Sequence, residues 1–191
     1  MRLALTIILF LFALVPNFAL AAPASGDRLV AIAWLVGDWG GIGEGRPGTS
    51  GSSRHAERVQ NDHFIRVEGR SVYPRQERNA SGEIHTSLDL WSFDRHRDLF
   101  VLRQFDSLGF VSTYVQDRAA SAGGRLVLVS EHLENVPAGW RGRYTYEQAA
   151  PDEYRELFEL DSGNGYEAYV SSRFLRVAPG PSPNAGQFGD S

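Results

Sequence analysis

The sequence feature that most constrains the fold is a regular alternation between strand-like segments and turn residues. After residue 37, turn-forming Gly, Pro, Asn and Asp recur roughly every eight to twelve residues, and the segments between them tend to alternate with period two. A helical pattern precedes them at residues 29–36 and stops at Gly37, a residue type common just after a helix. We therefore predict an all-β domain that begins with one short helix.

Ten segments carry the strand pattern: 39–45, 54–60, 63–72, 84–93, 99–105, 110–116, 125–131, 140–147, 153–160 and 166–177. The turns between them are mostly short, and no second helical block or long crossover separates them. Consecutive antiparallel strands of this number either stack as a sandwich or close into a barrel, and closure removes both sheet edges. We predict a closed, antiparallel up-and-down barrel of about ten strands over residues 27–177, with room for one small ligand.

The two ends of the chain differ from this domain. Residues 1–2 carry positive charge, residues 3–15 are almost entirely apolar, and residues 19–21 form an A-x-A cleavage site. The apolar run is shorter than the about 20 residues of a membrane helix. We therefore predict a signal peptide at 1–21, a periplasmic or secreted protein and no integral membrane span, with an uncleaved anchor as the alternative. The Pro- and Gly-rich residues 178–191 predict a disordered tail.

Composition excludes several kinds of chemistry. The chain has no Cys, which excludes disulfides, thiolate nucleophiles and Cys-based metal sites. All 19 basic residues are Arg, so a Schiff-base amine and a P-loop lysine are excluded as well. The formal net charge of -4 argues against a nucleic-acid partner, and the five His are scattered singly without metal-ligand spacing.

The residues that follow the predicted helix carry a resemblance to a known family. Leu35-Val-Gly-Asp-Trp-Gly-Gly-Ile-Gly-Glu-Gly45 resembles the opening of the calycin superfamily, specifically of the nitrobindin-like and fatty-acid-binding-protein-like ten-stranded β-barrels. Residues 99–105, 109–114 and 169–176 resemble the middle and last strands of uncharacterised bacterial barrels of this kind. The resemblance covers almost the whole predicted domain.

The resemblance implies a structural role for Trp39. In lipocalin-type relatives the equivalent Trp packs against an Arg of the last strand in a cation–π contact that closes one end of the barrel, and here Arg173 or Arg176 is the candidate. Direct contact between Trp39 and a ligand is the alternative. If Trp39 points inward, period two also directs Gly41, Gly43 and Gly45 inward, which leaves one wall of the barrel bare and makes space for a ligand.

Gly43, Gly45 and Gly48 match the dinucleotide-binding string G-x-G-x-x-G. We predict that Pro47 and the following Thr-Ser-Gly-Ser-Ser form a flexible loop, whereas the dinucleotide fingerprint must open a helix. The match is therefore accidental.

Haem is the cofactor that the resemblance raises. Nitrobindin-like barrels that bind haem use a His on the final strand, and matching the closing Leu175-Arg176 places Tyr169 there instead. Tyrosinate ligates ferric haem only where something such as a positive neighbour stabilises it, and Arg173 lies four residues further along the same strand. We predict no cofactor, with haem at Tyr169 as the alternative.

Arginine and tyrosine are the candidate ligand-binding residues. Arg103 alternates with Val101 and Phe105, so an inward-facing guanidinium would pair with an anionic ligand group. The alternatives are a salt bridge from Arg103 to Glu156 or Asp89, or an outward-facing Arg103, because the opposite strand face is apolar as well. Fatty-acid-binding proteins use an Arg and Tyr cluster for a carboxylate, and the matching candidates here are Tyr114, Tyr144, Tyr169 and Arg173.

These observations predict an exported barrel that binds a small, mainly apolar ligand, lipid-like or fatty-acid-like with an anionic head group. One alternative is haem binding. A second is a cavity-based isomerase or hydrolase that uses His132, Tyr or Glu as acid or base, and a third is a filled barrel that acts only as an interaction module. The size and polarity of the lumen distinguish them. The aromatic stretch at 140–146 is predicted to be an ordinary strand, and the sequence predicts no oligomeric state.

Overall fold

Ten antiparallel strands follow a short 3-10 helix in the computed structural model, which describes residues 26–177. The predicted signal peptide and the predicted tail lie outside the described residues. The elements are η1 (Arg28–Leu35), β1 (Gly37–Gly45), β2 (Gly48–Val59), β3 (Phe64–Tyr73), β4 (Glu83–Asp94), β5 (Leu99–Asp106), β6 (Val111–Gln116), β7 (Arg125–Glu134), β8 (Arg141–Ala150), β9 (Glu153–Asp161) and β10 (Glu167–Arg176).

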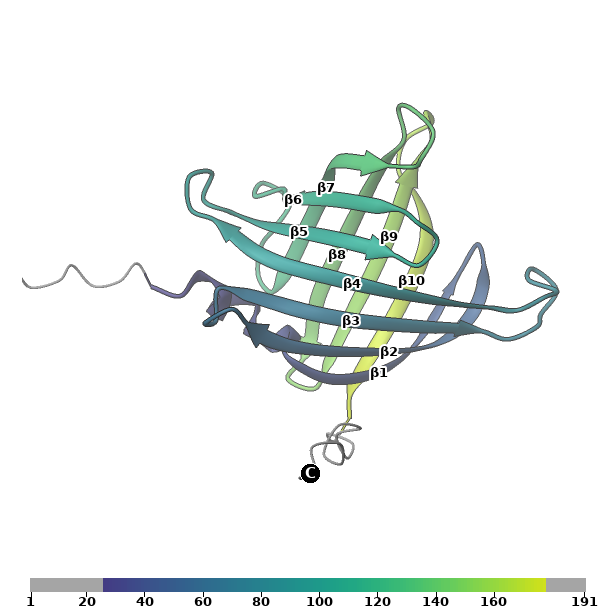
Figure 1. Ribbon diagram of the computed structural model, residues 1–191, viewed down its shortest axis with the longest axis horizontal. Helices are drawn as coiled ribbons and strands as arrows, with labels where there is room; N and C mark the ends of the chain where they lie inside the picture. The colour runs from purple at the N-terminus through teal and green to yellow at the C-terminus, as the bar shows by residue number, and fades with distance from the viewer. Residues whose placement is uncertain (1–25, 178–191) are drawn as a thin grey trace, which may run out of the picture.

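The strands form a closed up-and-down barrel, as predicted. Each strand pairs with its neighbours in the chain, and β1 pairs with β10 to close the sheet on itself. In Figure 1, β2 to β5 run across the view in front of β8 to β10, which cross behind them at a steep angle. The pairing of β10 with β9 contains a bulge between Ala168 and Val170, which changes the strand's alternation at Tyr169.

Strand β2 is longer than predicted, and the predicted flexible loop after Pro47 is wrong. A two-residue connection at Arg46 and Pro47 joins Gly45 to Gly48, and the Ser- and Gly-rich segment that follows pairs with β1 and then with β3. The low β-propensity of Ser and Gly is overridden by hydrogen bonding to strands on both sides. As a result, Ser50 and Ser52 become buried lumen residues.

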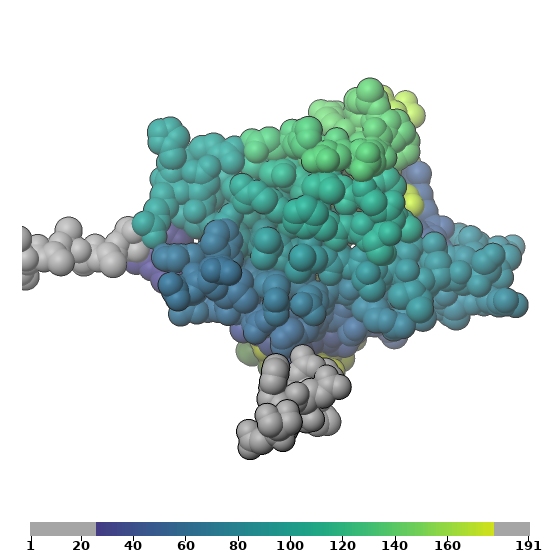
Figure 2. All heavy atoms as spheres, viewed as in Figure 1, coloured from purple at the N-terminus to yellow at the C-terminus, as the bar shows by residue number. Residues whose placement is uncertain are grey.

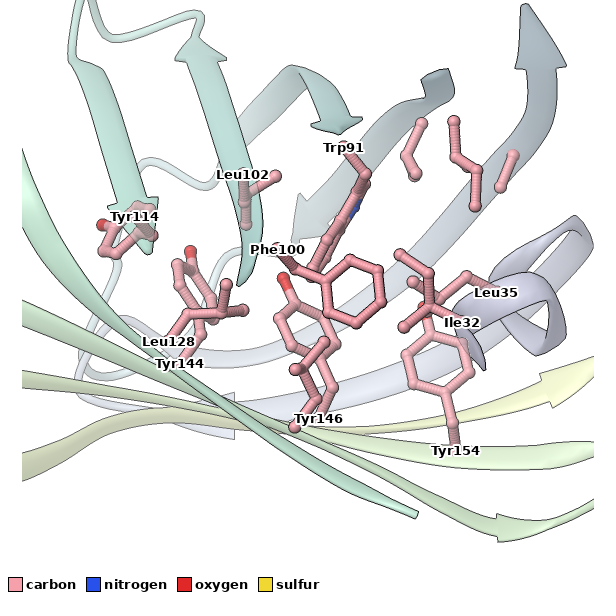
Figure 3. Close-up of a cluster of buried hydrophobic side chains, with 14 of the residues drawn as sticks. Ile32, Leu35, Trp91, Phe100, Leu102, Tyr114, Leu128, Tyr144, Tyr146 and Tyr154 are labelled. Atoms are coloured by element: carbon pink, nitrogen blue, oxygen red, sulfur yellow. The ribbon is translucent and has the colours of Figure 1, made fainter. Parts of the chain in front are cut away.

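The apolar core fills the end of the barrel beside η1. Figure 3 shows Ile32 and Leu35 of the helix beside Tyr154, with Trp91, Phe100 and Tyr146 further along the barrel. All of these side chains are buried, and the Trp91 and Tyr146 rings meet edge-on at a centroid distance of 5.1 Å. Burial of large aromatic rings stabilises the fold and blocks this end of the lumen.

Trp39 and Arg176 join the helix to the closing strand pair. The Arg176 guanidinium carbon lies 4.1 Å from the centre of the Trp39 ring, and Arg176 also donates hydrogen bonds to the carbonyls of Val36 and Trp34. The Trp39 indole nitrogen donates to the Leu35 carbonyl at 2.8 Å. Of the two arginines that the resemblance suggested, Arg176 is therefore the one that lies over Trp39.

Gly37 is required where the helix meets β1. Its φ is +125°, a conformation that side-chain-bearing residues rarely adopt, and a Cβ atom there would collide with the Arg176 guanidinium. The residue that ends the helical pattern in the sequence thus also leaves the space through which Arg176 reaches Trp39.

The hairpin formed by β3 and β4 projects from the barrel (Figure 1). Figure 2 shows the hairpin of β3 and β4 extending beyond the body of the barrel on one side. Within residues 26–177, no helix is long and apolar enough to cross a membrane.

Candidate functional site

The lumen contains a cavity of about 360 Å³. It reaches the end of the barrel formed by the β1–β2, β5–β6 and β7–β8 turns, away from η1. At its mouth, Leu108 and Phe110 from the β5–β6 turn and Val136 and Trp140 from the β7–β8 turn are apolar, and the charged Arg46 and Asp106 lie at the same end. Leu108 and Phe110 are also partly exposed to solvent. A small apolar molecule can therefore enter across these apolar side chains.

Small residues leave the space inside. A Cβ atom on Gly43 would lie 2.9 Å from the hydroxyls of both Ser50 and Ser172, so three small side-chain positions meet there. The hydroxyls of Ser50 and Ser52 are 3.3 Å apart. Gly41, in contrast, leaves no free space, because the Phe174 ring occupies the position of its missing side chain. The wall of the cavity therefore consists of serine as much as glycine.

Two of the predicted tyrosines face the cavity together. The Tyr114 and Tyr144 rings, which are labelled in Figure 3, meet edge-on at 5.0 Å. Tyr144 also packs on Phe158 at 4.6 Å. Burial raises the pKa of Tyr114 to about 12 and that of Tyr144 well above its ordinary value. Both phenols are therefore neutral at physiological pH. The Tyr144 hydroxyl lies 3.3 Å from the Gln104 side-chain oxygen and donates to it.

Tyr169 lies at the mouth of the same cavity. The bulge in β10 breaks the alternation there, so that Tyr169 lines the cavity although it is adjacent to Val170, which lines it too. Its ring is 5.9 Å from that of Phe158. The structure thus brings Tyr114, Tyr144 and Tyr169 around one space.

The two predicted arginines lie outside the barrel, and their assignment to the lumen is wrong. Arg103 is exposed on the outer face of β5, where it donates to the Ser92 hydroxyl at 3.1 Å. Arg173 is exposed on β10 and makes two hydrogen bonds to the Glu153 carboxylate, at 2.8 and 2.7 Å. The inward positions on these strands belong to Leu102 and Phe174, which are fully buried.

The buried arginine of the lumen is Arg54 on β2. Its guanidinium lies 3.9 Å from the Glu156 carboxylate and 5.0 Å above the Phe174 ring, and it donates to the Ser53 carbonyl at 3.1 Å. A Cβ atom on Gly69 would lie 3.2 Å from the Arg54 side chain, so this glycine provides part of its space. Burial raises the pKa of Glu156, and the positive charge of Arg54 opposes that effect.

A second buried carboxylate, Asp89 on β4, lies at the cavity floor. Only 5% of Asp89 is exposed, and its Oδ1 atom has no hydrogen-bond partner. Burial raises the pKa of Asp89 from its ordinary 3.8 to about 7, against the opposing effects of the positive charge of Arg54 and of the polar side chains of Gln104 and Ser87. A carboxyl group that is balanced between its two protonation states in a cavity is a frequent mark of a functional site.

A period-two pattern in the sequence indicates that Arg54 faces the interior, but the loop-like composition of the residues before it hides this pattern. Ser50, Ser52, Arg54 and Ala56 alternate along β2, and all four face the interior. Because the first half of this strand has the composition of a Gly- and Ser-rich loop, the period-two pattern is recognisable only from Arg54 onward.

The described residues do not fit a tyrosinate–haem site. The cation expected to stabilise the Tyr169 phenolate, Arg173, lies outside the barrel and is paired with Glu153. Arg46, 6.0 Å from the Tyr169 ring centre, is paired with Glu167. No group of three or more metal-ligating His, Asp or Glu side chains occurs within residues 26–177.

A second hollow, of about 530 Å³, lies on the wall formed by β1 to β4 and is wide open to solvent. It holds an exposed pair in which His55 Nδ1 lies 2.7 Å from the Asp38 carboxylate. The lumen cavity is the better candidate site, because it is less open to solvent than this hollow and its lining includes the unpaired oxygen of Asp89.

Comparisons with known proteins support the fold only. No family model matches the chain, and no curated protein matches its sequence. The chain is similar in structure to the protein Rv2717c from M. tuberculosis, known from a crystal structure, with a TM-score of 0.58. The two chains are 16% identical in sequence, and the match covers 78% of this chain and 97% of Rv2717c. At this level of identity the similarity shows a shared barrel architecture.

Proposed function

We propose that this protein is an exported, calycin-like binding protein that holds a small, mainly apolar ligand in the lumen of its barrel. The observation that carries the proposal is the cavity of about 360 Å³ that runs from a mouth with apolar side chains to a polar floor. Binding sites for small molecules are typically concave and mostly apolar, with a few polar groups that fix orientation.

The polar end of the ligand follows from the charges at the floor. Arg54 is the only cation buried there among the described residues, and it already faces Glu156 and Asp89. A ligand carboxylate would have to compete with both. The anionic head group suggested by the sequence depended on Arg103 and Arg173, which lie outside, so a ligand that donates hydrogen bonds fits better.

Binding is better supported than catalysis. The enzymatic alternative requires an acid and a base that converge within hydrogen-bond reach. His132 is exposed, with 66% of its side chain accessible to solvent, and within residues 26–177 no hydrogen bond links Asp89 to a tyrosine hydroxyl. The space in the lumen likewise argues against a filled barrel that serves only as an interaction module.

Native mass spectrometry of the exported protein tests the proposal. We expect a non-covalent small-molecule adduct on the wild-type chain that is lost in Ser172→Leu, because Ser172 lines the cavity. Ser171→Leu is the matched control, since its neighbour Ser171 is exposed on the outer face of the same strand. Identical spectra of the bare chain for all three proteins would contradict binding in the lumen.

Export is tested separately. Cell fractionation and N-terminal sequencing should find the protein outside the cytoplasm and beginning at Ala22, as the predicted cleavage after Ala21 requires. A full-length chain in the cytoplasmic fraction would contradict this part of the proposal without affecting the cavity.

A further inference from the structure

The unpaired oxygen of Asp89 is the strongest indication of what the cavity binds. Asp89 Oδ1 is buried and lines the cavity, yet no group of the protein donates a hydrogen bond to it. Leaving a buried acceptor unsatisfied costs stability, and such groups in folded proteins are generally paired. A donor supplied by a ligand would complete the site.

The charge balance at the cavity floor favours a cationic donor. Two carboxylates, Asp89 and Glu156, face one guanidinium, that of Arg54. Arg54 contacts the Phe174 ring and donates to the Ser53 carbonyl, and it makes no hydrogen bond to Asp89 Oδ1. With both carboxylates ionised, the positive charge of Arg54 balances only one of the two negative charges at the floor.

Aromatic rings form one wall of the cavity that also contains this carboxylate. Tyr114, Tyr144 and Phe158 pack on one another in this wall, with centroid separations of 5.0 and 4.6 Å. Ring faces attract cations and also pack on flat apolar groups. The same wall therefore accommodates both the charged end and the apolar body of one ligand.

We propose that the cavity binds a small organic amine in its protonated form, with the ammonium group donating to Asp89 Oδ1 and a ring-sized apolar body packed against the wall formed by Tyr114, Tyr144 and Phe158. This inference rests on the proposed ligand-binding function and names the chemical class of the ligand. A neutral molecule of the same shape would bind more weakly, and a carboxylate most weakly.

Amine binding should depend on pH through Asp89. The groups that face this carboxylate are Arg54 on β2, Gln104 on β5, and, across the lumen, Glu156 and the buried tyrosines of β6, β8 and β9: Tyr114, Tyr144, Tyr146 and Tyr154. The tyrosines stay neutral. His85 on β4 and Asp106 on β5 also line the cavity, so the pH dependence of Asp89→Asn is needed to separate the contribution of Asp89 from theirs. Protonation of Asp89 removes the charge that holds the ammonium, and affinity should therefore fall as the pH decreases from 8 to 5.

Calorimetric titration of the full exported chain with three probes of one shape tests the inference. The probes are phenethylamine, phenethyl alcohol and phenylacetate. A hydrogen bond to a charged group predicts that phenethylamine binds about ten- to a hundredfold more tightly than the alcohol at pH 8. This advantage should shrink at least severalfold at pH 5, where phenethylamine is still protonated.

Variants locate the effect. Asp89→Asn should remove the preference for phenethylamine and leave the affinity for phenethyl alcohol within about twofold, because the amide keeps the shape of the site. Asp62→Asn, the same chemical change at an exposed turn residue outside the cavity, should leave all three affinities unchanged. The pH dependence of the wild-type chain gives an independent reading if Asp89→Asn fails to fold.

The outcomes separate this inference from the proposed function. If the alcohol binds and Ser172→Leu abolishes its binding, but the amine is no tighter or phenylacetate is tightest, the amine inference is overturned and the binding function stands. An amine preference that survives Asp89→Asn also overturns it. If no probe binds at millimolar concentration, the amine inference is overturned. The probes then also give no support to the proposal that the lumen is a binding site.

Discussion

Replacement of Asp89 by Asn should stabilise the protein increasingly as the pH rises. Burial raises the pKa of Asp89 from its ordinary 3.8 to about 7, so between these values the folded chain binds a proton that the unfolded chain releases. The contribution of Asp89 to folding is therefore fully present below about pH 4 and is lost as the pH rises through 7. Asparagine mimics the protonated carboxyl at every pH and avoids this loss.

The magnitude follows from the size of the shift. A difference of about three pKa units, at about 1.4 kcal/mol per unit, corresponds to about 4 kcal/mol between pH 4 and pH 8. Asp94, Glu153 and Asp161, whose pKa values hydrogen bonds lower, also make stability depend on pH, but they are unchanged in the variant and cancel in the difference.

Urea unfolding monitored by tryptophan fluorescence measures this difference, because Trp39 and Trp91 are buried. We expect wild type and Asp89→Asn to have similar free energies of unfolding near pH 4 and the variant to be more stable at pH 8. Asp62→Asn should track the wild type throughout. A difference that does not change with pH, or a variant that is less stable at pH 8, would contradict this expectation, because ionised Asp89 would then be stabilised by Arg54 rather than penalised by burial.

Further predictions concern residues of the last strand. Arg176→Ala should lower the free energy of unfolding by about 2 kcal/mol, because it removes the contact with the Trp39 ring and two hydrogen bonds to helix carbonyls. Arg173→Ala should leave the urea midpoint unchanged, because its salt bridge to Glu153 is exposed; equal losses in the two variants would contradict the closing role of Arg176. Titration with ferric haem should produce no tyrosinate-ligated absorption spectrum, whereas such a spectrum that Tyr169→Phe abolishes would identify Tyr169 as a haem ligand.

The barrel itself can be predicted from the sequence because turn residues and period-two patterns are local signals. These signals locate all ten strands, and η1 ends where Gly37 predicts. They do not reveal the start of β2, because a Ser- and Gly-rich segment has no strand propensity of its own. It is a strand because β1 pairs with it from Gly48 and β3 pairs with it from Gly51 onward, which is information that the segment does not contain.

The orientation of the two predicted arginines cannot be derived from alternation. In β5 both faces are apolar: Phe100 and Leu102 point inward, while Val101, on the outer face, is only 1% exposed. Alternation cannot choose between two apolar faces. In β10 the bulge between Ala168 and Val170 means that Tyr169 lines the cavity while Arg173 points away from it, although a regular strand would place both on one face.

A crystal structure of the protein soaked with phenethyl alcohol is the decisive test of ligand binding in the barrel, because it shows whether a small apolar molecule occupies the lumen. We predict electron density for the ring beside Tyr114, Tyr144 and Phe158, with the hydroxyl directed toward Asp89. A lumen filled with rearranged side chains, or density for the probe only on the outer surface of the barrel, would contradict binding in the lumen.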